Sequence, residues 1–413
     1  MRFTALCPWL VLALLAGTGT GPSPGTAGHL EVAASPAGAP AGSGVSVRSV
    51  AAGGYAGYAV LSNGRVWAWG DDLEGQIGDA GPWSSLTLPV EVKGLSDVTS
   101  VAGGGNSAYA LRGNGTVWAW GDNSQGELGD GRFTARPLPG PVHSPRPVGL
   151  IAAGAFSVFA VGRDAKAWAW GDNSFGQLGT GSAQVGSTAP HEVARIENVA
   201  AVAAGSADGY ALLSDRTVWA WGDNSLGQLG GGACRLTAAG PRSTCLGSAV
   251  PDEVPGLRGV VAIAAGGDSG YALRRDGSVW AWGDDGYGEL GNALVRLDED
   301  VPVRVVGLTH VIAIAAGSCS GYALLTNGTV WSWGRGDYGQ LGDGATSDRS
   351  VPVQVKDLTN VVQVVGGGDM AFALLSNGEL WAWGANAYGQ LGDGSVTDHD
   401  LPVRVLGLPG PPP

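Results

Sequence analysis

The chain has 413 residues and a formal net charge of −13, and its lysines and arginines form no basic run. That balance argues against a surface that binds the phosphates of nucleic acid, which needs clustered basic side chains. Glycine accounts for 73 residues, and these glycines recur at fixed positions. The composition therefore indicates a repeat architecture and excludes an aperiodic low-complexity chain.

The N-terminal segment has the pattern of a secretory signal. Arg2 precedes an apolar run over residues 6–16, which is too short to span a bilayer. We predict a signal peptide over residues 1–28 and a Gly/Ala/Pro-rich linker over residues 29–44. The end of the chain, residues 409–413, is interpreted as a Pro-rich tail. No later segment is long and apolar enough for a membrane span, so we expect a secreted or extracellular protein.

Cysteine usage agrees with export. Cys7 lies in the predicted signal, and Cys234 and Cys245 lie in the longest insertion between repeats. A disulfide between Cys234 and Cys245 is predicted, since oxidising compartments preserve such bonds. Cys319 is expected to stand alone as a small buried residue.

Paired tryptophans mark seven copies of one unit. Successive copies begin 51, 50, 51, 61, 51 and 50 residues apart. A period this constant means that the fold must be deduced from the repeat. The pairs hold 14 of the 16 tryptophans and form the predicted structural core: Trp67/Trp69, Trp118/Trp120, Trp168/Trp170, Trp219/Trp221, Trp280/Trp282, Trp331/Trp333 and Trp381/Trp383.

Each unit contains four segments that predict strands. In the fifth copy these are residues 261–266, 270–273, 279–283 and 301–305. Most copies have Asn-Gly or Asp-Gly between the second and third segments, which favours tight type I′ hairpin turns. Asp164-Ala165 and Asp215-Arg216 replace that pair in copies three and four, where looser turns are expected.

The Val-Trp-Ala-Trp strand is apolar on both faces, with the indoles on one side and Val and Ala on the other. A sheet buried on both sides fits blades packed face to face around a ring. The small residues of the Ala-Ala-Gly run suit the innermost strand, and a proline strand suits the outer edge. The edge prolines are Pro89, Pro147, Pro190, Pro251, Pro302, Pro352 and Pro402.

The sequence thus predicts an all-β fold, a seven-bladed β-propeller of four-stranded antiparallel blades over residues 45–408. Over the same residues, the pattern Ala-Ala-Gly, Gly-x-Val-Trp-x-Trp-Gly-Asp-Asn-x-x-Gly-Gln-Leu-Gly and Pro-Val-x-Val resembles the regulator of chromosome condensation repeat family. The resemblance implies a seven-bladed propeller, here of a secreted bacterial type. The family commonly has a histidine three residues after the Ala-Ala-Gly glycine. This chain departs from that pattern at Ala56, Ser107, Ser157, Asp208, Ser269, Ser320 and Met370.

Loops that vary between copies are the predicted binding surface. The loops after Ala-Ala-Gly are expected near the mouth of a central channel, and their aromatic, acidic and amide side chains suit recognition of a protein or a sugar. The alternative is that they are variable loops without a function. The candidate binding residues are Tyr55, Asn106, Phe156, Asp208, Asp268 and Asp369, together with Trp83 and Phe133 from longer loops.

Several other patterns are interpreted as structural. The aspartates that follow Trp-Gly are expected to bond their own turns, and an aromatic row (Phe175, Tyr287, Tyr338, Tyr388) is expected to pack between blades. Residues 267–270 resemble the surroundings of a trypsin-like serine, but Ser269 occupies an ordinary repeat position. The five histidines lack the spacing of metal ligands. We therefore predict no catalytic residue, no metal and no cofactor.

The favoured function is that of a secreted, non-enzymatic binding scaffold, expected to be monomeric, that recognises a protein partner through propeller loops. Three alternatives stay open. Trp83, Phe156 and Tyr55 motivate a carbohydrate or cell-wall binding protein. A secreted propeller inhibitor of β-lactamases is similar in its repeats and suggests an inhibitor of a secreted enzyme. The family's eukaryotic role, guanine-nucleotide exchange on a small GTPase, is opposed by acidity and export. A hydrolase is the weakest hypothesis.

Overall fold

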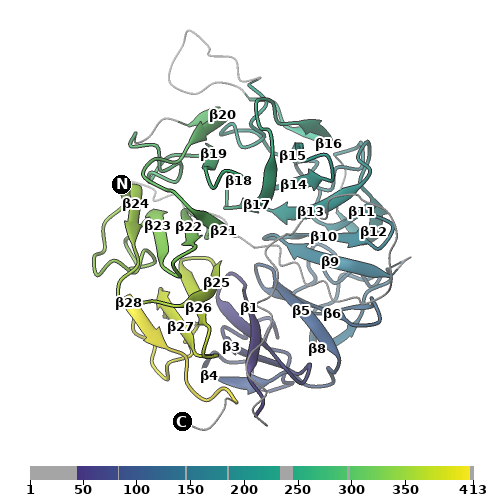
Figure 1. Ribbon diagram of the computed structural model, residues 1–413. Coiled ribbons are helices and arrows are strands. Elements are labelled where there is room, and N and C mark those ends of the chain that lie inside the picture. Colours follow the sequence, from purple (N-terminus) through teal and green to yellow (C-terminus); the bar gives the residue numbers. More distant parts are fainter. Residues whose placement is uncertain are drawn as a thin grey trace, which may run out of the picture.

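The computed structural model describes residues 44–81, 83–144, 147–183, 186–232, 245–294 and 298–409. These residues form seven four-stranded antiparallel sheets that stand around one centre (Figure 1). This part of the chain holds no helix long and apolar enough to cross a membrane. The predicted all-β, seven-bladed propeller is confirmed, whereas the predicted signal peptide and nearly all of the linker lie outside the described residues.

Each blade is one continuous segment, and its strands are hydrogen-bonded to one another in chain order. Blade 1 has β1 (Val47–Ala52), β2 (Ala56–Leu61), β3 (Val66–Gly70) and β4 (Leu86–Glu91). Blade 2 has β5 (Val98–Gly103), β6 (Ser107–Arg112), β7 (Val117–Gly121) and β8 (Arg136–Pro141). Blade 3 has β9 (Val148–Ala153), β10 (Ser157–Gly162), β11 (Ala167–Gly171) and β12 (Ser187–Glu192).

The remaining blades repeat this order. Blade 4 has β13 (Val199–Ala204), β14 (Asp208–Leu213), β15 (Val218–Gly222) and β16 (Ser248–Glu253). Blade 5 has β17 (Val260–Ala265), β18 (Ser269–Arg274), β19 (Val279–Gly283) and β20 (Glu299–Arg304). Blade 6 has β21 (Val311–Ala316), β22 (Ser320–Leu325), β23 (Val330–Gly334) and β24 (Arg349–Gln354). Blade 7 has β25 (Val361–Gly366), β26 (Met370–Leu375), β27 (Leu380–Gly384) and β28 (His399–Arg404).

The first strand of every blade lies innermost, as its small residues predicted. These strands contact their neighbours around the centre, and β1 contacts β25, so the purple and yellow ends of the ring meet (Figure 1). Crowding there explains the composition. A Cβ on Gly103 would come within 2.7 Å of the Ala52 carbonyl oxygen, and one on Gly366 within 2.4 Å of the Ala316 carbonyl oxygen. Only a residue without a side chain fits that approach.

The second tryptophan of each pair is buried between two blades. Trp120 of blade 2, for example, packs against Tyr58, Val66 and Ala68 of blade 1. Its indole meets the Tyr58 ring edge-on, with ring centroids 6.3 Å apart. The second tryptophans, each at most 1% exposed, are Trp69, Trp120, Trp170, Trp221, Trp282, Trp333 and Trp383.

The first tryptophan of each pair is partly buried and packs against the edge of the same apolar clusters, so the two indoles of a pair are not equally buried. It lies beside the hairpin turn at the beginning of the third strand, where Trp67, for example, opposes Glu91 of the outer strand. The partly buried set is Trp67, Trp118, Trp168, Trp219, Trp280, Trp331 and Trp381. Fully burying a large apolar side chain contributes roughly 1.5–3 kcal/mol, so each second indole stabilises the fold more than its partly buried partner does.

A hydrogen bond accompanies each of these interblade contacts. The indole N–H of the second tryptophan donates to a backbone carbonyl of the preceding blade, over 2.7–2.9 Å. The bond from Trp69 to the Gln390 carbonyl oxygen joins blade 1 to blade 7. Among the described residues, the ring therefore closes through side-chain packing and hydrogen bonds, with no strand shared between blades.

The hairpin turns differ from the predicted type I′. In blade 1, Gly64 has a φ of 75° while Asn63 is not among the positive-φ residues. The Gly64 N–H donates to the Leu61 carbonyl, and the Leu61 N–H to the Arg65 carbonyl. This is a type I turn followed by a left-handed residue, which makes a three-residue loop. The extra residue leaves the Asn63 carboxamide oxygen free to accept the Arg65 N–H, at 3.1 Å.

The turns expected to be looser are as tight as the others. Ala165 and Arg216 take φ values of 60° and 72°, the conformation that glycine has in the other blades. Their N–H groups donate to the Gly162 and Leu213 carbonyls at 2.9 and 2.8 Å. That expectation was wrong because the packing of the two flanking strands imposes the turn, whatever residue fills the left-handed position.

One edge proline was assigned to the wrong residue. Pro147 immediately precedes β9, and the outer strand of blade 2 is β8, which ends six residues before Pro147. In the sheet register, Trp118 opposes Pro141, as Trp67 opposes Glu91 in blade 1. Pro139 is therefore the counterpart of Pro89. The prolines flanking Leu138 hid the strand, since proline is tolerated only at such an edge.

The predicted disulfide between Cys234 and Cys245 cannot be placed, because Cys234 lies outside the described residues. Cys319 is buried, as expected. Neither Cys245 nor Cys319 is a free thiol in the part of the chain that the structure describes. The expectation that Cys319 stands alone was therefore wrong.

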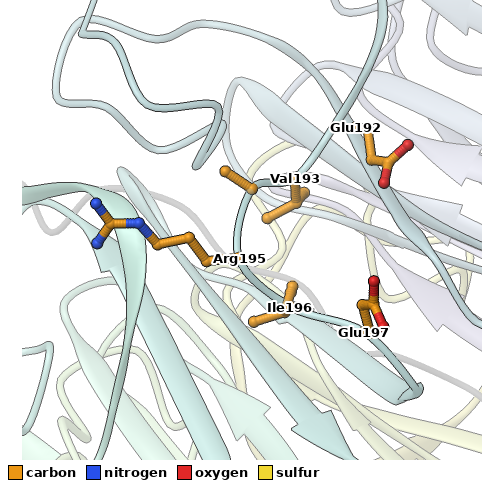
Figure 2. A pocket seen from close by; sticks show the side chains of 6 residues that line it. Glu192, Val193, Arg195, Ile196 and Glu197 are labelled. Carbon is orange, nitrogen blue, oxygen red and sulfur yellow. The ribbon is translucent and has the colours of Figure 1, made fainter.

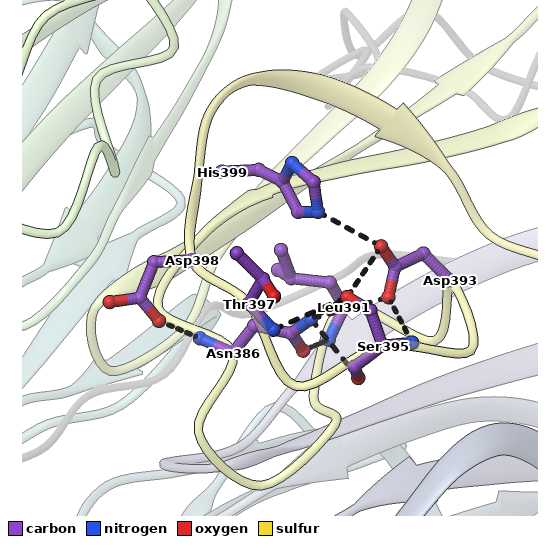
Figure 3. A network of polar contacts seen from close by, with 7 residues as sticks. All are labelled: Asn386, Leu391, Asp393, Ser395, Thr397, Asp398 and His399. Carbon is purple, nitrogen blue, oxygen red and sulfur yellow. Dashed lines mark hydrogen bonds and ion pairs between the residues drawn. The ribbon is translucent and has the colours of Figure 1, made fainter.

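Polar networks fasten the loops between third and fourth strands. In blade 7, the carboxylate of Asp393 accepts hydrogen bonds from Asn386 and Ser395 and lies 3.0 Å from Nε2 of His399 (Figure 3). Although burial opposes it, these bonds and the His399 imidazole hold the pKa of Asp393 below its usual range. The network ties the loop to the first residue of β28.

Candidate functional site

Seven loop residues surround the central axis on one face of the disc. Each lies two residues after the last glycine of the first strand's Ala-Ala-Gly run, just before the second strand begins. We call them the axial residues: Tyr55, Asn106, Phe156, Ala207, Asp268, Cys319 and Asp369. Five of the eight candidate binding residues are therefore gathered in one ring, and the face that carries it is called the binding face.

A closed circle of backbone hydrogen bonds holds these loops in place. Each blade donates one N–H to a loop carbonyl of the next blade, at distances of 2.7–3.4 Å. The circle ends where Gly368 of blade 7 donates to Gly53 of blade 1, at 3.3 Å. Because the loop backbone is held by its own hydrogen bonds, the conformation of these loops does not depend on which side chain stands at the axial position. This accounts for the variation of the axial side chains from blade to blade.

Asp208 is not an axial residue. It is the first residue of β14, it is 0% exposed, and its Oδ2 accepts a hydrogen bond from the Tyr210 hydroxyl at 3.3 Å. The axial position of blade 4 belongs to Ala207. The sequence assignment was one residue out of register, and a shift of one residue in a strand exchanges a surface side chain for a buried one.

Trp83 and Phe133 lie on the binding face, in the loops that join the third and fourth strands of blades 1 and 2. Their exposed fractions are 54% and 58%. Ser85, two residues after Trp83, donates to Asp71, and the carbonyls next to Phe133 accept from Asn123. These bonds anchor each loop beside its blade, and each aromatic ring faces solvent.

The paired tryptophans do not form part of the binding face. Their second members are enclosed by two blades, and their indole N–H groups are already bonded to backbone carbonyls. A ligand on the surface therefore cannot reach Trp69, Trp120, Trp170, Trp221, Trp282, Trp333 or Trp383. These seven indoles act on the site only indirectly, since they join the blades whose loops carry the axial residues.

A second row of side chains surrounds the axial ring. In every blade, the residue after Trp-Gly donates its backbone N–H to the carbonyl of the axial residue, over 2.8–2.9 Å. Where this residue is aspartate, a carboxylate oxygen accepts an N–H two residues later in its own turn, as expected. The row consists of Asp71, Asp122, Asp172, Asp223, Asp284, Arg335 and Ala385.

Acidic groups crowd together over blades 4 and 5. Burial, with the nearby carboxylates of Asp284 and Asp223, raises the pKa of Asp268 to about 7. Burial also raises the pKa of Asp284 to about 6. Beneath them, burial and the charge of Asp268 raise the pKa of Asp208 well above its usual value. Near neutral pH this sector can hold protons and carries a concentrated negative potential.

Aromatic groups dominate the next blades around the ring. Tyr287, Tyr338 and Tyr388 come from blades 5, 6 and 7, and Tyr388 packs on Tyr55 of blade 1 with ring centroids 4.9 Å apart. Tyr338 is exposed, as is Phe175 in blade 3. The interpretation of this row as interblade packing is thus correct for Tyr388, while Phe175 and Tyr338 present their rings to solvent.

Arg335 is a functional candidate that sequence reasoning missed. Its guanidinium carbon lies 5.2 Å from the Tyr287 ring centroid and 5.1 Å from that of Tyr338. Its Nη2 lies 2.7 Å from Asp337 Oδ2, and its Nη1 lies 3.6 Å from Asp369 Oδ1. The signal was present in the repeat, since Arg335 replaces the aspartate found in the first five copies.

Buried glutamine or glutamate side chains support this face from below. This glutamine or glutamate is the second residue of the Gly-Gln-Leu-Gly motif. In each blade its side-chain oxygen accepts the backbone N–H of the residue two positions earlier, over 2.7–2.9 Å. In blades 1, 3 and 4 the glutamine adds a bond from its Nε2 to the aspartate of the second row, as Gln177 does to Asp172 at 2.8 Å. The loop conformation therefore depends on a side chain within the core.

The serine that resembled a protease nucleophile is structural. Ser269 is buried, and its Oγ donates to the Tyr271 hydroxyl at 3.1 Å. A catalytic serine needs an adjacent base and access to substrate. Ser107 and Ser320 make the same contact with Tyr109 and Tyr322, which identifies a repeated structural bond.

A shallow hollow of about 390 Å³ lies on the loop between β12 and β13. Six consecutive residues line it, 192–197. Figure 2 shows the Glu192 and Glu197 carboxylates on one side and the Arg195 side chain extending away on the other. Because the polar groups diverge, this hollow lacks the convergent arrangement of a ligand site.

Comparisons with known sequences agree with this architecture. Residues 20–318 match the RCC1-like domain, and residues 327–374 and 377–412 match the regulator of chromosome condensation (RCC1) repeat. The human E3 ubiquitin-protein ligase HERC2 is 35% identical over 305 residues, covering 70% of this chain and 6% of HERC2. The Arabidopsis thaliana mitochondrial protein RUG3 is 30% identical over 304 residues, covering 72% of this chain and 56% of RUG3.

The fold is also similar to that of solved structures. Yeast RCC1 (Prp20), in its complex with Kap60, superposes with a TM-score of 0.72 at 23% identity, covering 82% of this chain and 83% of that one. The relatives named here are eukaryotic, so they lend no support to the expected secreted bacterial type. The repeat, the closed seven-bladed ring and the sequence matches together establish that this chain belongs to the RCC1-like domain family.

Proposed function

We propose that this chain is a secreted, non-enzymatic scaffold that recognises a protein partner through its binding face. The observation that carries the proposal is the contrast between a rigid loop backbone and variable side chains. Seven interblade hydrogen bonds fix the axial loops, while the axial side chains include aromatic, amide and acidic groups. Binding is favoured when the interacting groups are already held in place.

The composition of the binding face supports a protein partner. Aromatic residues and arginine are enriched in protein interfaces, and Tyr287, Arg335 and Tyr338 are grouped here. Relatives with the same fold engage proteins, as yeast RCC1 does with Kap60. The non-enzymatic part of the proposal rests on Ser269, whose buried hydroxyl is used in a structural bond.

The test is affinity capture from the secretome of the producing organism with the mature protein. A matched variant, Phe156→Ala with Tyr55→Ala, removes the axial aromatic rings of blades 3 and 1. A partner retained by the wild type and lost from the variant is the expected result. Recovery of the same proteins by both, with unchanged thermal unfolding, would move the binding surface elsewhere. Mass spectrometry of the exported form tests secretion and the predicted removal of residues 1–28.

Carbohydrate binding is the second candidate, favoured by the exposed rings of Trp83 and Phe133. Exposed aromatic rings bury the apolar faces of sugars, and neighbouring amides and acids accept hydroxyl hydrogen bonds. A glycan array probed with the wild type and with Trp83→Ala separates the two candidates. Glycan binding that depends on Trp83, without any captured protein, would favour the second.

A further inference from the structure

Arg335 shows what kind of group the binding face accommodates. Two tyrosine rings from consecutive blades, Tyr287 and Tyr338, flank its guanidinium at 5.2 and 5.1 Å. Carboxylates of Asp337 and Asp369 complete the surroundings, and the side chain is only 11% exposed. Cation–π attraction and charge-assisted hydrogen bonds act together in such a setting.

The same frame recurs one blade further around the ring. Tyr388 in blade 7 corresponds to Tyr338 in blade 6, and both backbone N–H groups donate to the buried glutamine of their loop, at 2.8 and 2.9 Å. Ala385 corresponds to Arg335, and both backbone N–H groups donate to an axial carbonyl at 2.8 Å. We call the space between two such tyrosines an interval. The interval between Tyr287 and Tyr338 holds the Arg335 side chain, whereas the interval between Tyr338 and Tyr388 has only the methyl group of Ala385 at the corresponding position.

Two carboxylates, those of Asp369 and Asp71, lie near this second interval. Asp369 is an axial residue of blade 7 and already attracts Arg335. Burial raises the pKa of Tyr55 to about 12, and Tyr388, Asp369, Asp71 and Tyr338 add to the effect because they lie close by. The chain as a whole carries a formal charge of −13. A cation that approaches this face is drawn to it, and an anion is repelled.

We infer that the interval between Tyr338 and Tyr388, above Ala385, binds an arginine side chain of a protein partner in the manner in which the neighbouring interval holds Arg335. The inference rests on the proposed function and specifies the chemistry of the partner. A guanidinium fits better than an ammonium because its flat face stacks on tyrosine while its edge reaches a carboxylate. Asp369 lies beside both intervals, because its carboxylate faces Arg335 and its backbone carbonyl accepts the Ala385 N–H.

The first arm of the test uses labelled peptides. A fluorescein-labelled decapeptide with one central arginine is compared with its citrulline analogue, which has the same shape without the charge, by anisotropy at low salt. We expect the arginine peptide to bind wild type about tenfold more tightly, which corresponds to about 1.4 kcal/mol. Equal binding of the two peptides would overturn the inference.

Two variants of the same loop locate the site. Ala385→Arg places a resident guanidinium in the interval and is expected to reduce binding of the arginine peptide to the citrulline level. Val396→Arg adds the same charge at an exposed position of the same loop, away from the residues that correspond to the contacts of Arg335, and is expected to change binding less than twofold. Thermal unfolding of both variants checks that the fold is intact. Unchanged binding by Ala385→Arg would also overturn the inference.

The second arm applies these variants to the captured partner. A partner retained by wild type and Val396→Arg, and lost from Ala385→Arg, supports the inference. A partner retained by all three leaves the proposed function standing and overturns the arginine site. If wild type captures no protein, the proposed function fails, and the peptide arm still decides whether the interval binds arginine.

Discussion

Glu127 and Glu289 occupy positions that are glutamine in the other five blades. One oxygen of Glu127 accepts the Gln125 N–H at 2.8 Å, and the other is buried without a hydrogen-bond partner. In blade 3, the corresponding atom is the Nε2 of Gln177, which donates to Asp172. A protonated glutamate can donate in the same way. Burial, with a smaller contribution from the Asp122 carboxylate, raises the pKa of Glu127 to about 7.

Replacing Glu127 with glutamine should therefore remove a pH dependence. A carboxyl whose pKa is raised in the fold stabilises it fully below the unfolded pKa of about 4.5, and that stability is lost as the pH rises towards 7. We expect Glu127→Gln to be more stable than wild type at pH 8 by on the order of 2–3 kcal/mol, with little difference at pH 4. Urea unfolding at both pH values measures this.

The control is Glu253→Gln, at an exposed position of β16. It should leave the unfolding midpoint unchanged at both pH values. If Glu127→Gln and wild type lose stability in parallel between pH 4 and pH 8, the glutamate is not protonated in the fold.

Phe159 leaves two polar atoms without the partner they have elsewhere. In five blades a tyrosine at this position donates its hydroxyl to the glutamine or glutamate carbonyl of its own blade. In blade 3 the Ser157 hydroxyl is buried without a hydrogen-bond partner, whereas Ser107 bonds Tyr109 at 2.7 Å. The missing hydroxyl therefore affects the serine as well as the carbonyl.

Phe159→Tyr is expected to stabilise the protein by about 1–2 kcal/mol, since each satisfied buried group contributes about 1 kcal/mol. The matched control is Phe372→Tyr in blade 7, where Met370 stands in place of the serine. It should gain less. Equal gains, measured as shifts in urea midpoint, would show that the serine plays no part.

Hairpin turns are the element in which local sequence and fold disagree most clearly. A left-handed conformation costs a residue with a side chain roughly 1–2 kcal/mol, and Ala165 and Arg216 both adopt it. Replacing either by glycine is expected to stabilise the protein by about 0.5–1 kcal/mol after the greater freedom of the unfolded chain is subtracted.

The reverse change provides the control. Gly378 has the same conformation, and a Cβ there would meet nothing closer than 3.9 Å. Gly378→Ala should therefore lower the free energy of unfolding by about 1 kcal/mol through backbone strain alone. Unfolding midpoints of Ala165→Gly, Arg216→Gly and Gly378→Ala test the three together, and a loss in either glycine variant would contradict the turn geometry.

At the scale of the whole molecule, both ends of the propeller meet. Val45 and Leu408 pack against the same apolar cluster between blades 7 and 1, and each blade is a continuous segment. A circular permutant that joins these ends by a short linker and opens the exposed connection between Glu197 and Asn198 should keep the fold. Thermal unfolding is expected within a few degrees of wild type, because every blade stays intact.

A second permutant, opened at Asp215 within the hairpin of β14 and β15, is the comparison. It cuts one blade in two and should lose much more stability, since its strands then pair through a long connection. Equal stability of the two permutants would show that the blade is not the folding unit.

Much of this architecture could be predicted from the sequence. Seven tryptophan pairs at a steady spacing report a repeated unit, and a strand that is apolar on both faces has to be covered on both. Local signals failed where a neighbouring element overrode them, as at Ala165 and at β8. In both places the packing of adjacent strands selected the conformation, against the preference of the residues themselves.

The sequence by itself determined the number of blades, their strand order and the variable loops, because each of these depends on a pattern repeated seven times. Only the tertiary structure decided which indole of each pair is fully buried and which variable side chains become neighbours. Asp208 is buried in the core, and Arg335 lies between tyrosines of two blades. Tyr55 of blade 1 packs on Tyr388 of blade 7, where the ring closes. The contacts of Arg335 with Tyr287 and of Tyr55 with Tyr388 join residues from different copies of the repeat, so only the assembled ring brings them together.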